Sequence, residues 1–327
     1  MSICIRRREF IAEAAAWPVA ARAQQPRLPV VGFVSLLSTA DALGMAAFRK
    51  GLSETGYAEG QNVSVEYHWL DGQFDRLPAL MADLVRRRVA VIATPASNAA
   101  SLAAKAATTT IPIVFSVGDD PVRLGLVASL ARPGGNATGV NFFVGEIVAK
   151  RLGLLHDLVP KAVRIAVLVN PANAYTAEAT QREITEAARA IGLQIQFLHA
   201  STSREIESAF ATLVRERADA LFVAADAYFP TRRVQFATLA AKHGIPASYG
   251  SRNFVEARGL MSYGIDNLEA SRQVGVYIGQ ILKGAKPSDL PVLQSTKFEF
   301  AINLQTARQL GLEVPSSVQS LADVVIE

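Results

Sequence analysis

Residues 111–120 read IPIVFSVGDD, an apolar run that ends in two adjacent carboxylates and is followed by Pro121. The β-branched and aromatic residues of 111–116 predict a buried β-strand, because such side chains pack well on the pleated surface of a sheet. Asp119 and Asp120 then stand where the strand ends. Asp120 before Pro121 is the arrangement of an N-cap with proline at the first helical position, so we expect it to open a helix.

The same kind of strand recurs along the chain and alternates with stretches of helical spacing. Strand-like runs lie at 29–34, 63–67, 89–93 and 111–116, and again at 164–169, 193–198, 219–224 and 245–249. Corresponding runs are 135, 132, 130 and 134 residues apart (Val30 to Ile165, Val63 to Ile195, Val91 to Leu221, Ile111 to Ile245). The alternation predicts parallel sheets wrapped by helices, and the matched offsets predict a duplicated α/β unit.

The segment 259–327 does not begin a third unit. It holds a helical stretch at 268–283, the break KGAKPSDLP at 283–291 and a strand-like run at 297–302. Such a tail indicates a chain that crosses back between two lobes, and several crossings form a hinge. We predict an α/β fold of two Rossmann-like lobes with parallel sheets joined by a multi-strand hinge. The first lobe is expected at 28–141 plus 268–291, and the second at 142–266 plus 295–327.

The N-terminus predicts an export signal at 1–23. Arginines at 6–8 precede a short apolar run at 11–21, and Ala-Arg-Ala at 21–23 precedes Gln24. This is the order of a secretory signal, and RREFI at 7–11 resembles a twin-arginine motif. The alternative is an unstructured basic tail. Removing 1–23 takes away four arginines and two glutamates, so the charge falls from +4 to 29 minus 27, or +2. The basic pI therefore indicates neither nucleic acid nor a membrane surface as a partner.

Ligands of parallel α/β sheets bind beyond the carboxyl ends of the strands. The loops at those ends carry hydroxyls, amides, carboxylates and aromatic rings, which suit the binding and release of a small polar solute. The candidate ligand-binding residues are Ser35, Ser38, Thr94, Ser97, Asn98, Asp119, Asn170, Tyr175, Asp226, Tyr228 and Tyr249.

We expect the serine loop at 35–38 and the helix start at 97–98 to hold a ligand carboxylate, because free N–H groups and the helix dipole favour an anion. Asp226 would pair with a ligand ammonium, and the candidate tyrosines would stack on the apolar part of the ligand. Capping of the following helix is the alternative role for Ser97 and for Asp226. Asp119 either faces solvent at the rim of the cleft or contacts the polar end of the ligand.

Catalytic, metal and cofactor sites are not indicated. The histidines at 68, 156, 199 and 243 have no partner at ligand spacing, and the single cysteine, Cys4, precedes the folded part. The chain has no nucleophile elbow, zinc-protease motif or phosphate loop, and its first strand turn lacks the glycines of a dinucleotide fingerprint. A LacI-type repressor would share the two-lobe body, but 1–27 is too short for its DNA-reading helices. We expect no cofactor, no metal and no nucleic-acid partner.

Several longer stretches resemble a known family, the ABC-transporter substrate-binding proteins of the TrpX type. They are GQFDRLPALMADLVRRRVAVIAT at 72–94, KAATTTIPIVFSVGDDPV at 105–122, LGLVASLARPGGNATGV at 124–140, ARGLMSYG at 257–264, ILKGAKPSDLPV at 281–292 and KFEFAINLQTARQLGL at 297–312. The resemblance implies a type I periplasmic binding protein fold, with three crossover segments and a ligand in the interlobe cleft. It also implies delivery of a small solute, best known as an aromatic amino acid, to a permease driven by an ATPase.

The chain departs from the family pattern at two candidate positions. Asp226 is followed by Ala227-Tyr228-Phe229 where the family commonly has Pro-Phe-Phe, and Asp119 stands where glycine is frequent. Both differences fall in loops expected at the cleft. They bear on which solute is bound rather than on whether one is bound.

We predict a soluble, non-enzymatic, monomeric receptor in the periplasm, with the twin-arginine route as the candidate route of export. It would capture a small carboxylate-bearing solute, an amino acid or an aromatic acid, and deliver it to ABC permease subunits. Two alternatives stay open. A sensor would present the same closed form to a membrane signalling protein, and a two-lobe enzyme would convert the solute.

Overall fold

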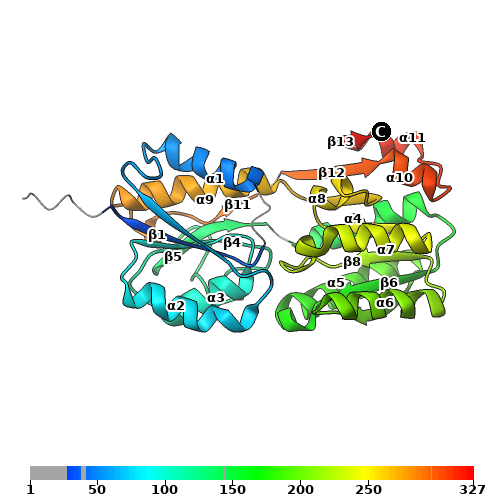
Figure 1. The fold of residues 1–327 in the computed structure, drawn as a ribbon, viewed down its shortest axis with the longest axis horizontal. Coiled ribbons are helices and arrows are strands. Elements are labelled where there is room, and N and C mark those ends of the chain that lie inside the picture. Colours follow the sequence, from blue (N-terminus) through cyan, green and yellow to red (C-terminus); the bar gives the residue numbers. More distant parts are fainter. Residues whose placement is uncertain (1–27, 38–41, 143, 296) are drawn as a thin grey trace, which may run out of the picture.

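The computed structural model describes residues 28–37, 42–142, 144–295 and 297–327, which form two α/β lobes side by side (Figure 1). The predicted 1–23 signal and Ser38 lie outside the described residues. The first sheet has the strand order β11-β5-β4-β3-β1-β2, with all neighbours parallel. Its strands are β1 (Val30–Ser35), β2 (Ser64–Trp69), β3 (Val91–Thr94), β4 (Ile113–Val117), β5 (Ala137–Asn141) and β11 (Leu293–Gln294).

The second sheet has the order β13-β12-β10-β9-β8-β6-β7. Its strands are β6 (Arg164–Val169), β7 (Gln194–His199), β8 (Ala220–Val223), β9 (Ala247–Tyr249), β10 (Met261–Ile265), β12 (Phe298–Asn303) and β13 (Val324–Ile326). All neighbours are parallel except β10 and β12, which are antiparallel because the chain re-enters this lobe from the hinge side. The two sheets confirm the predicted α/β class with parallel strands.

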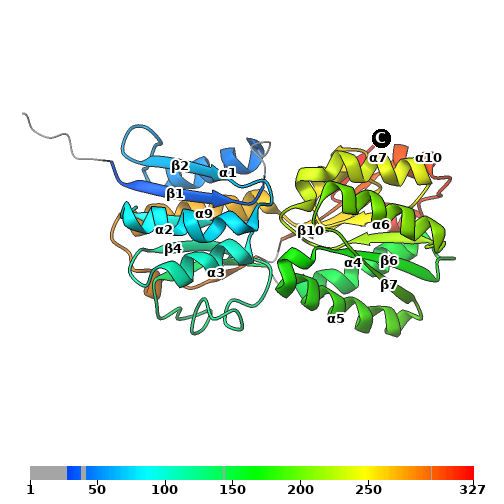
Figure 2. The same ribbon diagram turned by 60° about the horizontal axis from the view of Figure 1, so that its bottom comes forward.

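Helices cover both faces of each sheet (Figures 1 and 2). Around the first sheet lie α1 (Ala42–Glu54), α2 (Leu77–Arg86), α3 (Asn98–Ala107) and α9 (Asn267–Leu282). Around the second lie α4 (Val144–Leu158), α5 (Ala174–Ile191), α6 (Ser203–Arg215), α7 (Arg233–His243), α8 (Arg252–Glu256), α10 (Leu304–Gln309) and α11 (Ser316–Gln319). Short 3₁₀ turns are η1 (Phe74–Arg76), η2 (Pro171–Asn173), η3 (Phe229–Arg232) and η4 (Pro287–Asp289). Each lobe is therefore a three-layer sandwich with a core on either side of its sheet.

Helix α9 comes late in the chain and packs on α1 of the first lobe (Figure 1). Two glycines allow the close approach of these helices. A Cβ atom at Gly51 would lie 1.9 Å from the carbonyl oxygen of Arg272, and one at Gly275 would lie 2.2 Å from that of Phe48. Both distances are below any tolerable contact, so the helix pair requires glycine at these positions.

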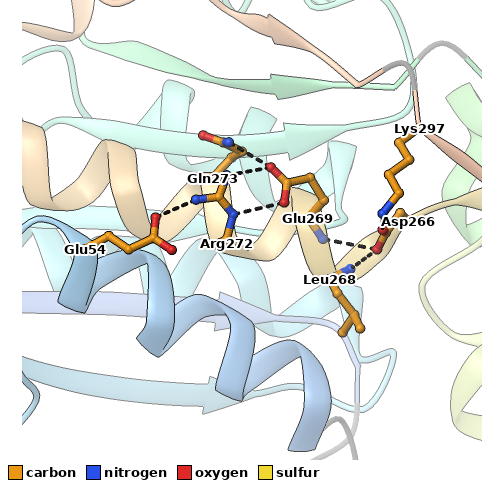
Figure 3. A network of polar contacts seen from close by, with 7 residues as sticks. All are labelled: Glu54, Asp266, Leu268, Glu269, Arg272, Gln273 and Lys297. Atoms are coloured by element: carbon orange, nitrogen blue, oxygen red, sulfur yellow. Dashed lines mark hydrogen bonds and ion pairs between the residues drawn. The ribbon is translucent and has the colours of Figure 1, made fainter.

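The chain crosses between the lobes three times, after β5, after β10 and after β11. Hydrogen bonds join these crossings to one another. The N–H of Ser295 donates to the carbonyl of Asn141 at 2.8 Å, and the ammonium of Lys297 bonds the carboxylate of Asp266 at 2.8 Å (Figure 3). Asp266 also caps α9 by accepting from the N–H groups of Leu268 and Glu269. The hinge is therefore a set of linked segments rather than a single flexible strand.

The prediction that a helix begins at Asp120 is wrong, because the structure has only a turn there. The Asp120 carboxylate does accept from the N–H of Val122 at 2.8 Å, and the N–H of Leu124 bonds the Asp120 carbonyl at 2.9 Å. Only one turn forms, because Gly125 has φ 72° and takes the left-handed conformation that ends a helix. The cap was readable from the sequence, whereas the early stop was not.

Candidate functional site between the lobes

Loops at the carboxyl ends of both sheets meet between the lobes and form what we call the interlobe seam. Its described contacts involve Asp71, Gly72, Asn98 and Asp119 of the first lobe and Thr176, Tyr228 and Arg232 of the second. Three of these residues, Asn98, Asp119 and Tyr228, were predicted site residues. The seam therefore lies where parallel α/β sheets bind ligands.

Asp119 lies at one part of the seam and bonds both lobes. It accepts a hydrogen bond from Asn98 Nδ2 within its own lobe and another, 3.3 Å long, from Thr176 Oγ1 of the other lobe. Asn98 Nδ2 also lies 3.2 Å from Thr176 Oγ1, and all three residues are 8% exposed. Burial raises the pKa of Asp119, and the hydrogen bonds from Thr176 and Asn98 oppose that rise in part. Asp119 therefore faces the opposite lobe.

Tyr228 and Arg232 form a second contact between the lobes. Arg232 Nε donates to the Tyr228 hydroxyl at 3.1 Å, and Arg232 Nη2 lies 3.5 Å from an Asp71 carboxylate oxygen. A Cβ atom at Gly72 would lie only 2.5 Å from Tyr228 Cδ2. The tyrosine ring of the second lobe thus rests directly on the backbone of the first.

Asp226 is the centre of a hydrogen-bond network within the second lobe. Its Oδ1 accepts from Asn170 Nδ2 and from the N–H of Tyr228, each at 2.9 Å, and its Oδ2 accepts from Asn173 Nδ2 at 3.1 Å. Burial nevertheless raises the pKa of Asp226, because desolvation outweighs these bonds. The bond from the N–H of Tyr228 places the carboxylate just before η3, whereas the helix that Asp226 was expected to cap, α7, begins at Arg233 with Arg232 as its N-cap. The backbone N–H of Phe229 also acts on this carboxylate by hydrogen bonding and lowers its pKa, so four donors oppose the effect of burial.

Three predicted side chains of the first lobe are engaged inside that lobe. Ser35 Oγ accepts from the N–H of Leu37, Thr94 Oγ1 bonds Ser101 Oγ at 2.9 Å, and Ser97 Oγ accepts from the N–H of Ala100 at 3.1 Å. Ser97 is the N-cap of α3, which confirms the capping alternative at that position. These hydroxyls shape the loops at the seam.

Two predicted tyrosines lie apart from the seam contacts described above. Tyr249 is 0% exposed, and its ring stacks on Phe254 with centroids 4.5 Å apart, so the face expected to cover a ligand is already covered. Burial raises the pKa of its hydroxyl, for which the described residues provide no hydrogen-bond partner. Tyr175 is exposed at the start of α5.

Sequence reasoning missed Arg151, a charged residue buried in the second lobe. It lies on α4 and is 2% exposed. Its helical neighbours Ile147 and Leu155, four residues away on either side, are also buried. An arginine within the apolar face of a predicted helix was the available signal, because residues at i and i+4 share a helix face.

No group of three or more acidic, histidine or cysteine side chains that would suit a metal ion occurs among the described residues. In the same part of the chain no helix is long and apolar enough to cross a membrane.

Known proteins resemble this chain over most of its length. It is 27% identical over 273 residues to the tyrosine-binding protein of Clostridioides difficile (strain R20291), which covers 81% of this chain and 76% of that protein. It is also similar to the ABC domain in complex with L-Trp from Streptococcus pneumonia, with 26% identity and a TM-score of 0.81 over 91% of this chain and 100% of that chain.

The arrangement of the lobes is closer to that complex than to an open relative. A ligand-free, open substrate binding protein with adhesive properties from Clostridium difficile has the same 26% identity but a TM-score of 0.64, over 91% of this chain and 99% of that one. Since a different angle between lobes lowers this global score, the lower value agrees with the contacts that hold the seam closed here. Residues 30–326 match the model of a family described as ABC transporter substrate binding protein. This chain therefore belongs to the family of ABC transporter substrate binding proteins.

Proposed function

We propose that this protein is the extracytoplasmic receptor of an ABC importer for an α-amino acid with an aromatic side chain. The observation that carries the proposal is the two-lobe arrangement shared with the L-Trp complex, at a TM-score of 0.81. The tyrosine-binding relative supports the same ligand class. The permease subunits of the importer would be the partner that recognises the closed form.

The proposed ligand binds between the lobes and the lobes then close on it. The negative charge of Asp226 would attract the ammonium of the amino acid, and Tyr228 would cover its apolar part. Closure follows binding because the closed form contacts the ligand from both sides and so has the higher affinity for it. The hydrogen bond between Thr176 and Asp119 and the packing of Tyr228 on Gly72 would form in the same motion.

The remaining predictions belong to this proposal. Residues 1–23 would direct export to the periplasm, with the twin-arginine route as the candidate route. The receptor would act as a monomer, without a cofactor, and would release its solute unchanged rather than catalyse a reaction.

A binding screen tests the proposal. Each of the twenty amino acids is added to the purified protein, and the melting temperature is measured. Every amino acid that stabilises the protein is then titrated into it by isothermal titration calorimetry. Tyrosine or tryptophan at a concentration 100 times its Kd is expected to add about 2.7 kcal/mol to the free energy of unfolding. Small-angle scattering with the same ligand should show a smaller radius of gyration. Absence of stabilisation by any amino acid would contradict the proposed function.

A further inference from the structure

Arg151 is a buried cation without an anionic partner among the residues that the structure describes. Its Nη2 donates to the carbonyl oxygen of Val223 at 2.8 Å, and its Cζ lies 3.8 Å from the centroid of the Phe222 ring. Its Nε has no hydrogen-bond partner in the described part of the chain. Burial lowers the pKa of the guanidinium, which still carries its charge at neutral pH. Buried charges in proteins are normally paired, so this guanidinium lacks a partner that it should have.

The surrounding sheet makes room for the guanidinium. A Cβ atom at position 250 would lie 2.9 Å from Arg151 Nη1, so Gly250 leaves space that any other residue would fill. Ser248 is in register with Phe222 on the neighbouring strand, so its side chain lies on the same face of the sheet. The Ser248 hydroxyl is 0% exposed and, within the residues that the structure describes, also has no hydrogen-bond partner. Two polar groups therefore lie on one face, both buried and both incompletely bonded.

This face ends at the interlobe seam. Val223 is the last residue of β8, and Gly250 directly follows β9. The chain continues from Val223 to Asp226 and Tyr228, which bond one another at the seam. The guanidinium thus lies at the carboxyl ends of two adjacent strands, next to the loop that carries the proposed ammonium partner. Ligands of this fold class bind at such strand ends.

Other cations near the seam are less suited to hold an anion. Arg182 is exposed, and Arg232 already bonds Tyr228 and Asp71. In the predicted carboxylate site of the first lobe, Ser35 and Ser97 accept hydrogen bonds from backbone N–H groups. Among the described residues of that site, 35–37 and 97–98, there is no arginine or lysine.

We propose that Arg151 binds the carboxylate of the amino acid, with the Ser248 hydroxyl as a neighbouring donor. This inference rests on the proposed function. An arginine offers a planar fork of donors that matches both oxygens of a carboxylate. Asp226 would bind the ammonium, so the second lobe would bind both charged groups of the amino acid. The first lobe closes over the ligand that the second lobe has selected.

The test compares each amino acid with its carboxamide, which keeps the ammonium and the side chain but has no carboxylate charge. The probes are L-tyrosine, L-tryptophan and their amides, titrated calorimetrically into the wild-type protein and into Arg151→Met. Wild type is expected to prefer the acid over the amide by at least about 30-fold, the effect of losing one partner of a buried charge pair. In Arg151→Met this ratio should fall close to one, while the amide binds as it does to wild type.

Two further variants separate binding from folding. Leu152→Ala removes a fully buried neighbour on α4 and should lower the melting temperature while it keeps the wild-type preference for the acid. Gly250→Ala pushes on Arg151 Nη1 without removing a charge and should reduce the preference, which provides the test if Arg151→Met does not fold. An undiminished preference in Arg151→Met, or in Gly250→Ala in its place, would overturn the inference and leave the proposed function intact. A wild-type protein that binds neither amino acid would overturn both.

Discussion

Thr176 of the second lobe donates a hydrogen bond, 3.3 Å long, to the carboxylate of Asp119 in the first lobe. The two residues are 57 positions apart in the sequence and belong to different lobes. Because the bond joins the lobes, we expect changes to it to affect closure more than the stability of either lobe.

Replacing Thr176 with valine keeps the shape of the side chain and removes the hydroxyl. Loss of one hydrogen bond of about 1 kcal/mol should weaken ligand binding about fivefold. Thr185→Val is the matched control, because the Thr185 hydroxyl is exposed and bonds a carbonyl of its own helix. Calorimetric titration of both variants is the measurement. Equal affinities would show that the bond does not favour closure.

Replacing Asp119 with asparagine should raise the melting temperature at pH 7. Burial raises the folded-state pKa of Asp119 above 3.8, so its contribution to stability is present below that value and is lost as the pH rises through the folded-state pKa. Asparagine needs no proton and can still accept from Asn98. The advantage of the variant should therefore shrink as the pH falls from about 7 to about 4.

The measurement is the melting temperature of wild type and of Asp119→Asn across this pH range. Asp75→Asn is the control, because it removes one negative charge from an exposed position. An advantage of Asp119→Asn that stayed constant with pH would exclude desolvation as its cause.

Replacing Gly72 with alanine should hinder closure. The new methyl group would lie 2.5 Å from Tyr228 Cδ2, and Gly72 has φ 76°, which costs an alanine about 1 kcal/mol. Gly60→Ala separates these effects, since Gly60 has φ 79° but no atom within 4 Å of the added Cβ. Both variants should lose similar stability, but only Gly72→Ala should show a larger radius of gyration by small-angle scattering in the presence of ligand. Identical scattering from the two would argue against contact of Tyr228 with the first lobe.

Replacing Gly51 with alanine should destabilise the protein, because its Cβ would collide with the carbonyl of Arg272 on α9. Gly153→Ala on α4 should do the opposite. It meets no atom within 4 Å, and alanine is favoured over glycine in a helix by about 1 kcal/mol. Denaturant unfolding of both variants provides the comparison, and a shift in the same direction for the pair would refute the close packing of α1 on α9.

The order of strands and helices was predictable because it follows from local periodicity. The matched runs at 111–116 and 245–249 became β4 and β9 with shifts of a few residues at their ends. The Ser97 cap was likewise visible, since a cap depends on residues three positions apart.

The partners of the site residues were not predictable, because they depend on distant packing. Nothing near Asp119 in sequence points to Thr176, and nothing near Tyr249 shows that Phe254 covers its ring. The sequence also did not show that β12 runs antiparallel to β10, because the alternation of apolar residues is the same in parallel and antiparallel strands. Arg151 was recoverable in principle from its place among buried helix positions.

The position of α9 has a consequence for biosynthesis. Ala270, Val274 and Ile278 cover the face of the first sheet that holds Val31 and Val114, yet they are translated more than 150 residues after those strands. A nascent chain that has just emerged as far as β10 already contains β6 to β10 of the second lobe, while one face of the first sheet is still uncovered. The N-terminal lobe, although begun first, is therefore completed only after most of the second lobe has been made. Until then its exposed apolar face is the part of the newborn polypeptide most in need of a chaperone.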